Sequence, residues 1–72
     1  MQTQNPDVLT VQDIASLNMV VEHLSQVKKF HRENSYYLLE TEFGVRSITH
    51  IKRADYDRAM ALLVDLHNVT MH

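Results

Sequence analysis

The chain has 72 residues, a formal net charge of −2 at pH 7 and no cysteine. A domain of this size buries only about 60% of the surface of its unfolded chain, so its own core is marginal. The absence of cysteine excludes disulfides and thiolate metal sites, and nucleic-acid-binding domains are usually more basic. Because the sequence shows neither a secretory signal pattern nor a run of about 20 apolar residues, we expect a cytoplasmic protein with no membrane contact.

The first part of the chain is mostly polar, so we expect a flexible N-terminal tail over 1–9 and a single helical domain over 10–72. Thr10 and Asp13 have the spacing of a capping box at a helix start. Apolar residues then recur at the period of an amphipathic helix, which predicts a first helix over about 11–31. This apolar stripe consists of Val11, Ile14, Leu17, Val21, Leu24 and Val27.

The segment His31–Ser35 is the weakest helical stretch, because it contains an asparagine and a serine that favour helix caps. A turn there predicts a helical hairpin whose second helix covers about 35–43. The alternative is one continuous helix over 11–43. Gly44, the only glycine, should end this helix, because glycine adopts a left-handed conformation without strain.

An apolar connector follows, in which Ser47 is placed to cap a single turn leading to Ile51. A third helix is predicted over about 53–69, with Asp55 and Asp57 near its start, where negative charge complements the helix dipole. The sequence therefore predicts an all-α domain in which the third helix packs across the hairpin. Its core should include Ile14, Leu17, Val21, Leu39, Phe43, Val45, Ile51, Tyr56, Leu63 and Leu66.

A motif around Gly44 is similar to a known family. A helix ends in Phe-Gly-Val, a short connector follows, and the next helix begins with an aspartate and an aromatic residue before an alanine. In this order, residues 36–60 resemble the C-terminal helical module of phage antirepressor and Rha-type regulatory proteins. The matching positions are Phe43, Gly44, Val45, Ser47, Ile48, Ile51, Asp55, Tyr56 and Ala59.

The resemblance implies a phage or prophage regulatory protein, located in the cytoplasm of a bacterial host, without enzymatic activity. The chain departs from the family pattern at several positions. Ile48 stands where the family has a tyrosine, and the prolines often found near Arg46 and Lys52 are missing. Acidic residues replace a more basic stretch before Phe43, which argues against a role in facing DNA.

The titratable residues do not form a recognisable reactive motif. No two of the five histidines have the spacing of three or four residues that places two ligands on one helix face, so we expect no metal site. Glu40, Glu42, Asp55 and Asp57 lie near predicted helix ends, where they are typical of capping or solvated groups. We therefore predict no catalytic residues and no cofactor, and hence no enzyme.

The preferred functional interpretation is protein–protein association. The apolar stripe of the first helix spans roughly 140°, which is wide for a small domain. Adjacent tyrosines on a helix point about 100° apart, so one of the two must lie outside the core. We expect a homodimer that forms through the outer part of the first helix, or binding of a host or phage regulatory protein. The candidate partner-binding residues are Met19, Val20, His23, Tyr36 and Tyr37.

A small nucleic-acid-binding hairpin is the alternative function. Two groups of basic residues surround the predicted hairpin, and Phe30 lies within the first group, where it could stack on a base. If the hairpin brought both groups together, one face would be basic despite the negative net charge. The residues of this alternative site are Lys28, Lys29, Arg32, Arg46, Lys52 and Arg53.

Overall fold

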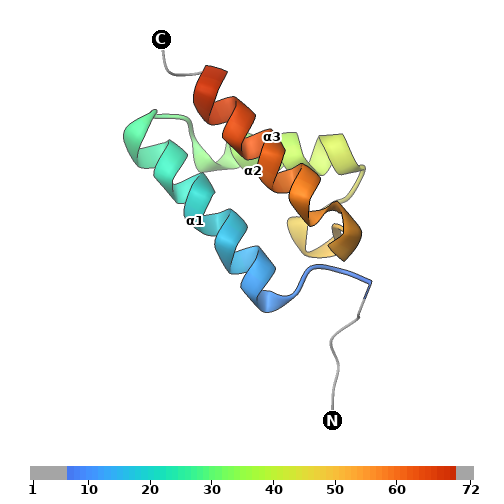
Figure 1. The fold of residues 1–72 in the computed structure, drawn as a ribbon. Coiled ribbons are helices and arrows are strands. Elements are labelled where there is room, and N and C mark those ends of the chain that lie inside the picture. The colour runs from blue at the N-terminus through green and yellow to red at the C-terminus, as the bar shows by residue number, and fades with distance from the viewer. Residues whose placement is uncertain (1–6, 70–72) are drawn as a thin grey trace.

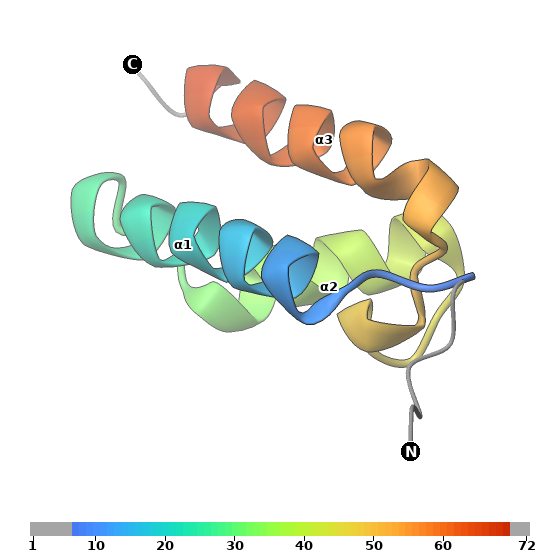
Figure 2. The same ribbon diagram turned by 60° about the horizontal axis from the view of Figure 1, so that its bottom comes forward.

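The computed structural model describes residues 7–69 of the chain, and within them it shows an all-α fold, as predicted. Helices α1 and α3 lie side by side and run in the same direction, while α2 returns the chain behind them (Figure 1). A second view shows the same arrangement (Figure 2). The elements are α1 (Val11–Val27), α2 (Arg32–Phe43), the 3₁₀ helices η1 (Ile48–His50) and η2 (Arg53–Asp55), and α3 (Tyr56–Val69).

Helix α1 begins with the predicted capping box. The backbone N–H of Asp13 donates to Thr10 Oγ1 at 3.0 Å, and the backbone N–H of Thr10 donates to Asp13 Oδ2 at 3.1 Å. The helix ends at Val27, earlier than the predicted residue 31. Lys29 adopts a left-handed conformation with φ 58°, which breaks the helix and excludes the alternative of one continuous helix over 11–43.

Helix α2 begins at Arg32 rather than at residue 35. The carbonyl of His31 accepts hydrogen bonds from the backbone N–H groups of Asn34 and Ser35, so the predicted capping residues lie inside the helix. Its end agrees with the prediction: Gly44 has φ 64°, and its N–H donates to the carbonyl of Glu40. An added Cβ at this position would meet no atom within 4 Å, so lack of space is not the reason for the glycine. The reason is the left-handed backbone conformation, which residues with a Cβ adopt only with strain.

The connector between α2 and α3 contains two short 3₁₀ helices. The Ser47 hydroxyl accepts a hydrogen bond from the backbone N–H of Thr49 at 3.3 Å, which confirms the predicted cap of the turn before Ile51. The third helix, predicted from residue 53, starts as η2 and becomes α-helical at Tyr56.

The predicted N-terminal tail requires a correction at 7–9. The backbone N–H of Leu9 donates to the carbonyl of Ile51 at 3.1 Å, and the N–H of Arg53 donates to the carbonyl of Asp7 at 2.9 Å. Val8 and Lys52 form an isolated antiparallel bridge between these two pairs. The structured part therefore includes 7–9, because the connector supplies backbone partners and the core accommodates the Leu9 side chain. Residues 1–6 and 70–72, which the predictions also covered, lie outside the described residues.

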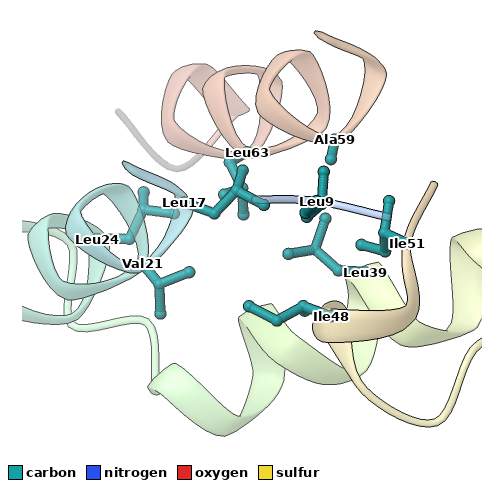
Figure 3. Close-up of a cluster of buried hydrophobic side chains, with 9 residues drawn as sticks. All are labelled: Leu9, Leu17, Val21, Leu24, Leu39, Ile48, Ile51, Ala59 and Leu63. Carbon is teal, nitrogen blue, oxygen red and sulfur yellow. The ribbon is translucent and has the colours of Figure 1, made fainter. Parts of the chain in front are cut away.

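The buried side chains converge between the three helices, the connector and the N-terminal segment (Figure 3). Half of the predicted core is buried, namely Leu17, Val21, Leu39, Ile51 and Leu63. The other half is partly buried and packs against it, namely Ile14, Phe43, Val45, Tyr56 and Leu66. Buried apolar residues that the predicted core did not include are Leu9, Leu24, Ile48 and Ala59.

Leu9→Ala tests the corrected N-terminal boundary. Truncating a buried leucine costs about 2–5 kcal/mol of the free energy of unfolding, which is a large part of the stability of so small a domain. Urea denaturation followed by circular dichroism should show this loss. The neighbouring Val11 is 76% exposed, so the control Val11→Ala should change the free energy by no more than about 0.5 kcal/mol. If both variants changed the free energy of unfolding equally, the correction would be wrong and the predicted tail over 1–9 would stand.

Ser35 provides a second test of the core. It is fully buried on α2, and its hydroxyl has no hydrogen-bond partner in the described structure. Because an unsatisfied buried hydroxyl is costly, Ser35→Ala should raise the free energy of unfolding by about 1 kcal/mol. Thermal unfolding should then occur several degrees higher, roughly 4–8 °C per kcal/mol at this chain length. The control Ser47→Ala removes a hydroxyl that does accept a hydrogen bond, so it should lower the free energy of unfolding instead.

Candidate interaction surface

The predicted partner-binding residues do not form a single patch. Met19 and Tyr37 are 73% and 70% exposed, but they lie on different helices. Val20 and Tyr36 are partly buried and pack against the core. The prediction that one of the adjacent tyrosines lies outside is confirmed by Tyr37. Whether any of these residues binds a partner stays a prediction.

Tyr36 joins α2 to α1. Its hydroxyl donates to Asn18 Oδ1 at 2.7 Å. Nearby, Arg32 forms an ion pair with Glu22 at 2.8 Å. Burial raises the pKa of the Tyr36 phenol, while the charge of Arg32 lowers it and that of Glu22 raises it. Tyr36 therefore serves a contact within the protomer, which makes it a weaker candidate for an intermolecular one.

A different surface arises where α1 and α3 lie side by side. The rings of His23 and His67 are stacked, with centroids 5.5 Å apart and an angle of 24° between their planes. This contact fixes which sides of the two helices adjoin each other, and residues three or four positions away in sequence share those sides. We call this surface the α1–α3 strip. From the helical spacing we assign to it Val20, His23 and Val27 of α1 and Met60, Val64 and His67 of α3. We leave out Met19, which is 73% exposed and turns further from the core.

The α1–α3 strip is partly open to solvent and largely apolar. Val27 is 54% and Val64 46% exposed, while Val20 and Met60 are partly buried against the core. No lysine, arginine or acidic residue belongs to the strip. The sequence prediction named Val20 and His23 but missed the residues of α3. The helical spacing of Met60, Val64 and His67 can be seen in the sequence. The sequence does not show that this side of the helix lies beside α1.

The opposite side of α3, which adjoins α2, carries charged groups beside the apolar Phe43 and Leu62. The Arg58 guanidinium lies 5.0 Å from the centroid of the Phe43 ring. It also forms ion pairs with Glu42 at 3.7 Å and with Asp55 at 3.5 Å. These groups are substantially exposed, and such pairs contribute little to stability. They do keep this side of α3 charged, in contrast to the α1–α3 strip.

The basic residues of the alternative function lie in two separate groups. Lys28, Lys29 and Arg32 surround the turn before α2, and the other three belong to the connector after it (Figure 1). Helix α2 has 12 residues and therefore separates the groups by about 18 Å. Arg32 is moreover paired with Glu22. The hairpin therefore does not bring the two groups together. Whether either group binds nucleic acid stays a prediction.

The hollows on the surface are shallow and open. One of about 370 Å³ lies at the start of α1 and is lined by residues that include Asp13, Arg53 and Asp57. The Asp13 carboxylate already accepts a hydrogen bond from the Thr10 N–H in the capping box of α1. Within residues 7–69 there is no group of three or more histidine, aspartate or glutamate residues arranged to hold a metal ion. No helix in the same range is both long and apolar enough to cross a membrane.

No protein-family model matches the chain, and neither the curated proteins nor the solved structures include a significant match. The resemblance to the phage antirepressor module therefore depends on the sequence motif alone.

The contact of Tyr36 with α1 predicts a pH effect. A raised pKa means that the folded chain favours the neutral phenol, so its contribution is complete below the unfolded value of about 10 and is lost as the pH rises through the folded pKa. The urea midpoint of the wild type should thus decrease between about pH 9 and about pH 11 more than that of Tyr36→Phe.

Tyr36→Phe should also lower the free energy of unfolding at neutral pH by about 0.5–1 kcal/mol, because it removes the hydrogen bond to Asn18. The matched control is Tyr37→Phe, at a position that is 70% exposed. It should leave both the neutral stability and the alkaline decrease unchanged. An identical alkaline decrease in wild type and Tyr36→Phe would contradict the assignment.

Proposed function

We propose that the protein functions by protein–protein association, and that its first partner is a second copy of the chain bound through the α1–α3 strip. The observation that supports this most directly is the partly open apolar surface of two adjacent helices. Val27 and Val64 are about half exposed there, beside Val20 and Met60, which are partly buried. Each contributes favourable free energy if a partner removes its remaining apolar surface from water, at roughly 25 cal/mol per Å² before association costs.

A second copy is the simplest occupant of this surface. A two-fold axis places the same patch of both protomers in contact, so the patch must be complementary to itself in shape and charge. The α1–α3 strip meets this requirement, because it contains no lysine, arginine or acidic residue that would face an equal charge. The net charge of −2 adds little repulsion. Pairing would place two helices of one protomer against two of the other and would enlarge a marginal core.

The regulatory context of the proposal comes from the resemblance. The Phe43-Gly44-Val45 motif, with Asp55 and Tyr56 after it, supports a regulatory protein of phage or prophage type. In that context the dimer would bind a host or phage regulatory protein in the bacterial cytoplasm. The exposed Met19 and Tyr37, which lie outside the α1–α3 strip, are the residues available for this second contact.

Sedimentation velocity over a range of concentrations tests the association. The wild type should show a mass that rises with concentration. Val64→Glu should weaken self-association at least tenfold, about 1.4 kcal/mol, because it places a charge in the apolar contact. Tyr37→Glu is the matched control, since it introduces the same charge at an exposed apolar position outside the strip. It should associate like the wild type.

Two results would contradict this proposal in different ways. A compact wild-type monomer at every concentration would exclude self-association altogether. Association that is lost in Met19→Glu but retained in Val64→Glu would instead place the contact on the outer side of α1, as the sequence alone suggested.

A further inference from the structure

We propose that His23 and His67 form a two-histidine binding site for a divalent late transition-metal ion such as Zn²⁺, which links α1 to α3. The two side chains come from different helices, and their ring centroids are 5.5 Å apart. Imidazole nitrogens are ordinary ligands of zinc, copper and nickel. This inference concerns a ligand of the single protomer and does not depend on self-association.

The ring separation suits shared coordination. A zinc–nitrogen bond is about 2.0–2.1 Å long, so the centre of a coordinating imidazole lies roughly 3 Å from the ion. Two such rings at a tetrahedral angle have centres roughly 5 Å apart, close to the 5.5 Å observed. The centres of the two rings therefore already have about the separation that the site requires.

The ring orientations must change before both rings can coordinate one ion. The planes are now within 24° of parallel, so the rings face each other instead of directing nitrogens at one point. Rotation about the bond to an imidazole ring has a broad energy minimum. Turning the two rings, at the cost of their present contacts, is therefore the change that binding a common ion requires.

The surroundings of the pair leave it accessible. His23 is exposed and His67 is half-buried, so an ion and its water ligands can approach from solvent. The neighbours on the α1–α3 strip are uncharged, namely Val20, Val27, Met60 and Val64. Because the described residues offer no third ligand nearby, water would complete the coordination. The site is thus of the open, exchangeable kind rather than a closed structural centre.

Metal binding would stabilise the fold. The two histidines belong to separate helices, so the unfolded chain does not hold them together, and the ion binds the folded state preferentially. In a small domain without cysteine, such a link takes the place of a disulfide between α1 and α3.

The test uses the full chain without an affinity tag, treated with a chelator and then titrated with Zn²⁺ alone. With Zn²⁺ in about tenfold excess over its dissociation constant, the melting temperature should rise by about 6 °C or more. His23→Ala and His67→Ala should each lose this shift. His50→Ala is the matched control, because His50 is an exposed histidine on η1, away from the pair, and it should retain the full shift.

A second measurement keeps the test decisive if a variant fails to fold. In nuclear magnetic resonance spectra of the wild type, Zn²⁺ should shift the imidazole signals of His23 and His67 together and leave those of His50 unchanged. The proposal is overturned if Zn²⁺ shifts neither ring, or if both alanine variants bind it like the wild type.

Discussion

The position of α3 depends on how the N-terminal segment holds the connector. After Gly44 the chain must turn back across the end of the hairpin, and this connector buries only two large apolar side chains, Ile48 and Ile51. The backbone bonds from Leu9 to Ile51 and from Arg53 to Asp7 fix this segment from outside. They direct the chain into α3 so that it runs beside α1 and in the same direction (Figure 2). The α1–α3 strip and the His23–His67 pair are consequences of this direction.

Local signals explain why so much of the fold could be predicted. The capping box of Thr10 and Asp13 and the left-handed Gly44 involve only neighbours in sequence, and the structure confirms both. The end of α1 could not be predicted, because its signal is the left-handed conformation of Lys29, a residue that rarely adopts it. The Phe30 N–H donates to the Leu24 carbonyl there, which closes the helix without glycine.

The features that the sequence did not reveal depend on distant contacts. Leu9 was predicted as part of a polar tail, but its backbone N–H donates to the Ile51 carbonyl and its side chain is buried in the core. His23 and His67 are likewise far apart in sequence, so a search for spacings within one helix could not pair them. By contrast, the angle between adjacent side chains on a helix is a local property. It was sufficient to predict that one of Tyr36 and Tyr37 lies outside the core.

The polar contacts contribute little to holding this domain together. The ion pairs of Arg32 and Arg58 lie on the surface, where water competes for each charge and where such pairs contribute about 0–1 kcal/mol. Stability must therefore come mainly from the small apolar cluster between the helices (Figure 3). Any additional burial or link between α1 and α3 would be large relative to the total. This is why we propose the same surface for both association and metal binding.

The two proposed roles of the α1–α3 strip constrain each other. An ion held by His23 and His67 with water ligands brings charge and bound water into the strip, which opposes a dry apolar contact. A second copy that covers the strip would have to displace those waters or replace them with its own pair of histidines. Four imidazoles around one ion satisfy the tetrahedral preference of zinc. Metal binding and self-association would therefore be antagonistic in a contact that excludes the ion, and cooperative only where both copies coordinate it.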